Sequence, residues 1–217
     1  MIECLLFDLD GTLINTAPEM AAALNQLRLQ EGLEKLPFEQ IRPHVSQGAA
    51  ALIRLGFKIE ADDPQFEVLR QAFLGHYASQ HVTQSQLFKG MPQVLEHIQQ
   101  HNLQWGIVTN KPTRFTLPLL AALKLTPAST VCGDSLSFRK PHAEPILHAC
   151  KEIGCKVNKT VYIGDADTDI LAGKNAGTHT LAASYGYLAA DEDINRWQAD
   201  AQIQQPTDIL HWLKKMK

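Results

Sequence analysis

The sequence lacks the features that mark membrane, secreted and nucleic-acid-binding proteins. No apolar run approaches the roughly 18 residues that a membrane-spanning helix needs, and the chain does not open with a basic segment, an apolar stretch and a cleavage site. The net charge is -3 and the lysines and arginines are scattered, so there is no basic surface for nucleic acid. We therefore expect a cytoplasmic protein that binds neither membranes nor nucleic acid.

Cysteine is also scarce. The four cysteines, Cys4, Cys132, Cys150 and Cys155, show neither a C-x-x-C spacing nor another pairing typical of zinc ligands. Three of them, Cys4, Cys132 and Cys150, have apolar neighbours in the sequence. Most of these thiols are therefore expected to be reduced and to pack in the core.

The composition is that of a globular protein with a substantial core, with 217 residues of which 45% are hydrophobic and 20% are charged. From residue 90 onwards, short apolar runs alternate with helical patterns. Strands are predicted at 5–7, 105–110, 130–133, 160–165, 178–183 and 201–203. This alternation predicts an α/β fold with a Rossmann-like, doubly wound parallel sheet that carries helices on both faces.

Residues 15–88 interrupt the alternation with helical patterns alone. Thr16 and Pro18 mark a helix start, and a strongly helix-prone run is expected to end at Gly56. We therefore predict an all-helical domain over 15–88, inserted into an α/β core formed by 1–14 and 89–217. A helical block in this place suggests a separate lid.

Two acids follow the first predicted strand. Asp8 and Asp10 are spaced i, i+2 on an extended segment, so both side chains can face one site, and Gly11 provides a turn. The carboxyl end of a strand is where open α/β sheets bind their ligands. On their own, the two acids are equally compatible with an ordinary turn.

Three further polar segments follow strands of the predicted sheet. They are Thr109-Asn110, Lys140-Pro141 and Asp165 to Asp169. Taken singly, they are compatible with a helix cap, a solvated lysine and an acidic turn, whereas the spacing of the last one does not fit a calcium loop. Because parallel strands end at one rim, we expect all of these segments to contribute to a single site.

Together and in this order, the segments Asp-x-Asp-Gly-Thr, Thr-Asn, Lys-Pro and Gly-Asp-x-x-x-Asp resemble the haloacid dehalogenase superfamily of phosphatases. The resemblance extends over essentially the whole chain. It implies that the helical insert is a cap domain, that Mg²⁺ is the cofactor and that the substrate is a small phosphorylated molecule. The protein is expected to be a monomer or a homodimer.

The chemistry of phosphoryl transfer fits the same residues. Asp8 would attack phosphorus and form an aspartyl-phosphate, and Asp10 would protonate the leaving oxygen and then activate water. Thr109, Asn110 and Lys140 would bind the phosphate, Lys140 also neutralising Asp8.

The predicted metal ligands are oxygen atoms. Asp8, Asp165 and the backbone carbonyl of Asp10 are hard ligands of the kind that Mg²⁺ prefers. Asp169 follows Asp165 by one helical turn, and it is expected to anchor a metal-bound water or to hold Lys140.

Substrate specificity is expected to come from the cap and the rim. Arg42 and Arg114 are candidates, each equally compatible with a surface salt bridge, and Lys111 is another. The layout resembles phosphoglycolate phosphatases, whereas the segments 106–115, 185–187 and 195–197 resemble N-acetylmuramic acid 6-phosphate phosphatases. Both substrates carry a carboxylate that an arginine would bind, and the choice between them stays open.

Three alternatives remain. A phosphosugar mutase of the same superfamily shares all four motifs. A non-catalytic phosphate-binding protein would be expected to lack Asp8 or Asp10, and a phosphoacceptor of the response-regulator kind would lack the helical insert. Two departures from the family pattern leave the hinge and loop geometry open: Asn15 stands where an acid is common, and the segment Lys140-Pro141-His142-Ala143 lacks a second proline.

Overall fold

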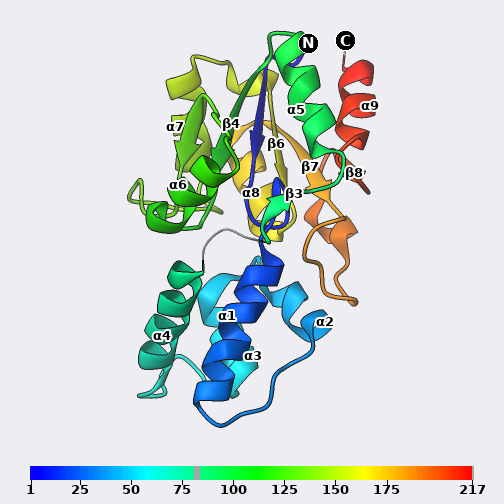
Figure 1. The fold of residues 1–217 in the computed structure, drawn as a ribbon. Coiled ribbons are helices and arrows are strands. Elements are labelled where there is room, and N and C mark those ends of the chain that lie inside the picture. Colours follow the sequence, from blue (N-terminus) through cyan, green and yellow to red (C-terminus); the bar gives the residue numbers. More distant parts are fainter. Residues whose placement is uncertain (81–83, 217) are drawn as a thin grey trace. The chain divides into compact units, whose positions relative to one another are not determined.

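A computed structural model describes residues 1–80 and 84–216. The chain forms two compact units, one made of Met1–Ile14 with Leu87–Lys217 and the other of Asn15–Gln86. It passes from one unit to the other within two short strands, β2 (Ile14–Asn15) and β3 (Gln86–Leu87), which form a two-stranded sheet (Figure 1). The first unit is called the core unit below and the second the helical unit.

The core unit is built on a six-stranded sheet with the order β5-β4-β1-β6-β7-β8. Neighbouring strands of this sheet pair in parallel, as the sequence predicts. The apolar first strand is fully buried, as expected for a central strand of a sheet that is covered on both faces. The strands are β1 (Cys4–Phe7), β4 (Gln104–Val108), β5 (Ser129–Val131), β6 (Thr160–Gly164), β7 (His179–Ala183) and β8 (Ala201–Ile203).

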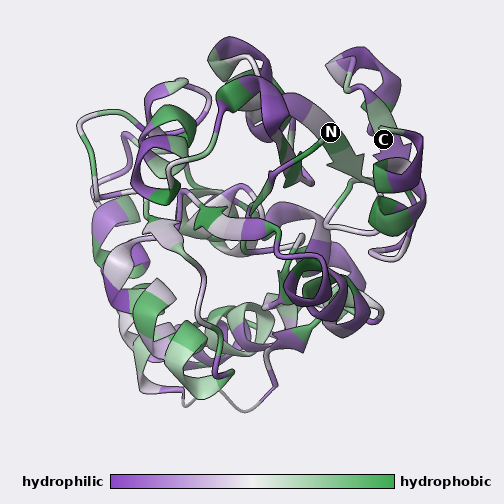
Figure 2. Cartoon of the chain, turned by 90° about the horizontal axis from the view of Figure 1, so that it is seen from above, coloured by the Kyte–Doolittle hydropathy of each residue, from purple (hydrophilic) through white to green (hydrophobic). Residues whose placement is uncertain are grey.

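Helices cover the sheet in two layers, which confirms the predicted doubly wound fold. The chain runs outward from β1 through β4 to β5 and then returns to β6 on the other side of β1. Because crossovers between parallel strands are right-handed, this reversal moves the helices to the opposite face. The helices show hydrophilic and hydrophobic stretches in Figure 2, as amphipathic layers do. They are α5 (Met91–Gln100), α6 (Thr113–Ala122), α7 (Glu144–Ile153), α8 (Asp167–Ala176) and α9 (Asp208–Lys215).

The helical unit has its own core, in which α1 packs against α4 and α3. Leu24, Leu27, Leu52 and Phe73 are buried there. The elements are α1 (Ala17–Gln30), α2 (Phe38–Ile41), the 3₁₀ helix η1 (Arg42–His44), α3 (Gly48–Phe57) and α4 (Phe66–Ser79). Within the described residues, no helix has the length and the apolar character needed to cross a membrane.

The predicted helix end at Gly56 is wrong. Gly56 lies inside α3, which ends at Phe57 and is capped by Lys58 with a left-handed φ of 56°. The glycine serves packing instead, because a Cβ at position 56 would lie 2.8 Å from Cδ1 of Leu24. The missing side chain therefore allows α3 to approach α1 closely.

Candidate active site

Polar side chains gather at the carboxyl ends of the three central strands. Phe7, the last residue of β1, is in register with Ile107 of β4 and Ile163 of β6. The residues that follow these strands therefore reach the same rim of the sheet. Asp8 comes directly after β1 and Asp165 directly after β6, and both are buried.

Lys140 is the centre of this cluster. Its Nζ lies 2.6 Å from Oδ1 of Asp8 and 2.6 Å from Oδ1 of Asp169, and it donates to the Tyr162 hydroxyl at 2.9 Å. Tyr162 in turn donates to the carbonyl oxygen of Val108 at 2.7 Å. The ammonium group is thus fully engaged, and it ties the loop before α7 to the ends of β1 and β6.

The cluster carries an excess of negative charge. Burial opposes the charge of Lys140, but Asp169 and Asp8 outweigh it and raise the pKa of Lys140. Burial raises the pKa of Asp8, and repulsion from Asp169 and Asp165 adds to the shift, which Lys140 only partly offsets. Three carboxylates with one ammonium therefore form a cluster suited to a further cation.

Asp165 is held from both sides by groups far away in the sequence. The hydroxyl of Thr12 donates to its Oδ1 at 3.1 Å, and the backbone N–H of Tyr187 donates to its Oδ2 at 2.9 Å. Tyr185 donates its hydroxyl to the carbonyl of Thr12 at 3.0 Å, so the two clamping segments are themselves joined.

Two glycines permit this close packing around Asp165. A Cβ at Gly11 would lie 2.8 Å from Oδ1 of Asp165, and a Cβ at Gly186 would lie 2.6 Å from Oδ2. Gly11 also has a φ of 84°, in the left-handed region that glycine adopts without strain. Any larger residue at either position would displace the carboxylate.

The acidic residues fit a magnesium ion. Asp8, Asp165 and Asp169 each offer a carboxylate oxygen, and these atoms lie within 4.8 Å of one another. Hard oxygen donors of this kind suit Mg²⁺. Oδ1 of Asp169 already accepts Lys140 and lies 3.1 Å from the Tyr162 hydroxyl oxygen, and its Oδ2 accepts the N–H of Ala166 at 3.1 Å. The Asp10 carboxylate is not part of this group among the described residues.

Asp10 makes a different contact. Nζ of Lys111 lies 3.1 Å from each of its two carboxylate oxygens. Both side chains are largely buried, with 5% of Lys111 and 15% of Asp10 exposed. The sequence points to Lys111 only as a candidate for substrate specificity, and its contact with Asp10 could not be foreseen.

The residues after β4 connect the site to the Lys140 loop. The Thr109 hydroxyl accepts the backbone N–H of Lys111 at 3.2 Å. The side chain of Asn110 donates to the carbonyl of Lys140 at 3.1 Å and accepts its N–H at 3.0 Å. The sequence predicts a phosphate-binding role for Asn110, and the structure adds that its side chain holds the backbone of Lys140.

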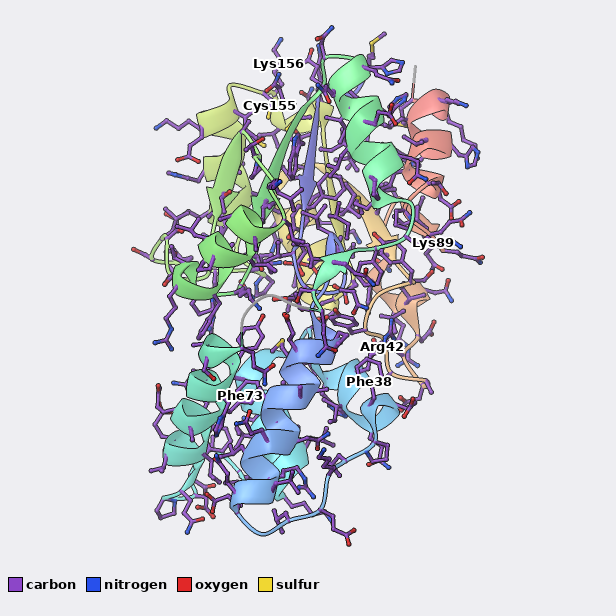
Figure 3. The ribbon with its side chains drawn as sticks, viewed as in Figure 1. Phe38, Arg42, Phe73, Lys89, Cys155 and Lys156 are labelled. Atoms are coloured by element: carbon purple, nitrogen blue, oxygen red, sulfur yellow. The ribbon has the colours of Figure 1, made fainter. Side chains whose placement is uncertain are left out.

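The two candidate arginines belong to different parts of the molecule. Arg42 is half-buried in η1 of the helical unit (Figure 3). Arg114 is exposed in the first turn of α6, with its guanidinium carbon 4.7 Å from the centroid of the Phe115 ring. Among the described residues, the hydrogen-bond partners of Asp8, Asp165 and Asp169 do not include Arg114.

Several residues of the site escape sequence reasoning. In the sequence, Thr12 stands out only as part of the first motif, and Tyr187 only as part of a segment that resembles one group of phosphatases. Tyr162 is the residue that the sequence could have indicated. It lies in the middle of a buried strand, is itself fully buried, and has a hydroxyl that needs a hydrogen-bond partner.

Comparisons with known proteins agree with the geometry. The model of the family described as "Haloacid dehalogenase-like hydrolase" matches residues 5–183. The N-acetylmuramic acid 6-phosphate phosphatase of Pseudomonas aeruginosa is 36% identical over 216 residues, covering 99% of this chain and 96% of its own. The phosphoglycolate phosphatase of Xanthomonas campestris pv. campestris is 40% identical over 206 residues, covering 94% and 93%.

A solved structure shows the same fold over nearly the whole length. The structure titled as a predicted phosphoglycolate phosphatase from Haemophilus somnus matches with a TM-score of 0.85 and 25% identity, and it covers 98% of each chain. The resemblance seen in the motifs is therefore confirmed: the chain belongs to the haloacid dehalogenase-like hydrolase family.

Proposed function

We propose that this protein is a Mg²⁺-dependent phosphomonoester hydrolase that forms an aspartyl-phosphate on Asp8. The family and the phosphatase names of its relatives support the reaction class. The assignment of Asp8 as the nucleophile rests on the different surroundings of its two carboxylate oxygens. Oδ1 is bound by Lys140, whereas no hydrogen bond reaches Oδ2 from the described residues, and 10% of the side chain is exposed.

The first half of the reaction transfers the phosphoryl group to the protein. Oδ2 of Asp8 forms a bond to phosphorus while the bond from phosphorus to the ester oxygen breaks, and Asp10 gives its proton to the leaving oxygen. Lys140 fixes the other oxygen of Asp8 and neutralises charge on the phosphate. Thr109 supplies a hydroxyl to the phosphate oxygens.

The second half releases phosphate. Asp10, now a carboxylate, takes a proton from a water molecule that attacks phosphorus, and the bond between phosphorus and Asp8 breaks. Asp8, Asp165, Asp169 and the backbone carbonyl of Asp10 would hold Mg²⁺. When bound, Mg²⁺ neutralises charge on the phosphoryl oxygens.

We also propose that the substrate is a small phosphorylated acid, either 2-phosphoglycolate or N-acetylmuramic acid 6-phosphate. The support lies in the names of the two groups of relatives. Both molecules carry a carboxylate, for which Arg42 and Arg114 are the candidate partners. We assign the helical unit the role of a cap whose closure keeps bulk water from the intermediate.

A panel of phosphomonoesters tests these proposals. Phosphate release is measured with Mg²⁺ and with EDTA on 2-phosphoglycolate, N-acetylmuramic acid 6-phosphate, hexose phosphates and a hexose bisphosphate. We expect release that requires Mg²⁺ and strongly prefers one of the two acids. Interconversion of hexose phosphate isomers without release would show a mutase, and full activity in EDTA would refute the metal dependence.

A further inference from the structure

Asp10 has two tasks in the proposed reaction, and both depend on where its carboxyl group points. It must reach the leaving oxygen in the first half and the attacking water in the second. The backbone around it is set by the turn after β1, in which Gly11 N donates to the carbonyl of Ile14 at 3.1 Å. This turn does not by itself determine the rotamer of the Asp10 side chain.

Lys111 provides that constraint. Its Nζ is 3.1 Å from both oxygens of Asp10, so the contact defines the plane of the ionised carboxylate as well as its position, and one oxygen still accepts the ammonium when the other carries the proton. Only 5% of the Lys111 side chain is exposed. Ion pairs that are shielded from water in this way are costly to break, unlike surface pairs.

The backbone of Lys111 is itself anchored. Its N–H donates to the Thr109 hydroxyl at 3.2 Å, and its carbonyl accepts the N–H of Gly133 at 3.0 Å. The ammonium therefore extends from a fixed point at the end of β4 to Asp10 at the end of β1, and it spans 101 positions of the sequence.

From this geometry we propose that Lys111 is a positioning residue that holds the carboxyl group of Asp10 in line with the leaving oxygen. The inference rests on the proposed phosphatase reaction. It differs from a role in binding the carboxylate of the substrate, because Lys111 then acts on every substrate whose leaving oxygen needs a proton, with or without a carboxylate.

Aryl phosphates separate the two roles, because they carry no carboxylate and their leaving groups differ in the need for a proton. The phenolate that leaves from phenyl phosphate requires a proton from an acid, whereas the 2,4-dinitrophenolate that leaves from 2,4-dinitrophenyl phosphate is a stable anion. Because kcat/KM reports the steps through the first phosphoryl transfer, it is compared for the wild type, Lys111→Met, Lys111→Arg, Asp10→Asn and the double variant Asp10→Asn, Lys111→Met.

We expect Lys111→Met to lose about 10- to 100-fold in kcat/KM on phenyl phosphate and less than about 3-fold on the dinitrophenyl ester, within the usual contribution of an acid catalyst. Lys111→Arg should recover most of the loss. In the double variant, Lys111→Met should add nothing to the effect of Asp10→Asn.

Lys159→Met is the matched control. Lys159 forms a more exposed ion pair with Glu3 in the same unit, at 2.6 Å and with 38% of its side chain exposed, so neither substrate should be affected. If Lys111→Met lost kcat/KM equally on both esters, or if its loss added to that of Asp10→Asn in the double variant, the positioning role of Lys111 would be overturned. The proposed phosphatase function would still stand. A wild-type chain that releases phosphate from neither ester would overturn the proposed function and this role with it.

Discussion

Replacing Gly186 by alanine tests whether the packing around Asp165 supports the proposed metal site. Gly186 is not among the residues with positive φ, so the backbone tolerates a side chain there and only crowding opposes it. The new Cβ would meet Cβ of Asp165 most closely, and it would also lie 2.6 Å from Oδ2 and 2.7 Å from Cγ of Asp165. An ordinary contact begins at 3.4 Å, so Oδ2 alone must move away by about 0.8 Å, and Cβ of Asp165 must move further.

That displacement is large for a metal ligand. Mg²⁺ requires nearly ideal octahedral geometry, and the distances between a metal ion and its ligand atoms vary by only about 0.2 Å in a functional site. Moving Asp165 would also break its hydrogen bonds with Thr12 and Tyr187. Loss of such supporting contacts typically weakens metal binding by about 10- to 100-fold, which corresponds to about 1.4–2.7 kcal/mol.

The assay is a Mg²⁺ titration of phosphate release, together with a thermal melt of the metal-free protein. We expect Gly186→Ala to need about 10- to 100-fold more Mg²⁺ for half-maximal activity. Gly75→Ala is the control, because a Cβ at Gly75 meets no atom within 4 Å in α4. It should leave the Mg²⁺ requirement unchanged and stabilise the fold by about 0.5–1 kcal/mol. An unchanged Mg²⁺ requirement in Gly186→Ala would refute the reasoning.

Three further predictions concern the same unit. Asp8→Asn should reduce turnover by at least about 10³-fold with an unchanged circular dichroism spectrum, and substantial retained activity would rule out Asp8 as the nucleophile. Tyr162→Phe should lower the free energy of unfolding in urea by about 1–3 kcal/mol, because Val108 loses a buried donor and Lys140 loses an acceptor; an unchanged midpoint would contradict this. Burial raises the pKa of the Cys150 thiol to about 12 and raises that of Cys4 as well. Both should therefore react with Ellman's reagent at pH 8 only after unfolding, and rapid labelling of all four thiols in the native protein would disprove it.

The fold could be predicted from the sequence because its signals are local. Apolar runs such as that of β1 alternate with amphipathic helices, and this pattern alone indicates a parallel sheet. The same pattern places Asp8 and Asp165 directly after strands, and the residues that follow parallel strands meet at the edge of the sheet where ligands bind. The error at Gly56 arose because a glycine can end a helix or allow close packing of two helices, and only the partner, Leu24, distinguishes these uses.

The supporting contacts could not be predicted, because each depends on segments that meet only in the folded chain. Thr12 and Asp165 are separated by 153 positions, and the side chain of Asn110 meets Lys140 across 30. The segment around Gly186 shows the limit most clearly. Its residues suggested a resemblance to one group of phosphatases, whereas their position against Asp165 gives them a structural role that no local pattern indicates.

Cys155 and Lys156 lie before β6, at the end of the core unit opposite to the acidic cluster (Figure 3). Ribosomal synthesis must continue past Cys155 and Lys156, through β6 and on to Tyr187 before the backbone N–H of Tyr187 can bond Asp165. The ion-pair partner of Asp8, Lys140, follows it by 132 positions. Pairing over such separations is slow compared with the formation of single helices. In a growing chain, Asp8 therefore lacks its ion-pair partner until Lys140 has been made, and the hydrogen bond that Tyr187 donates to Asp165 forms later still.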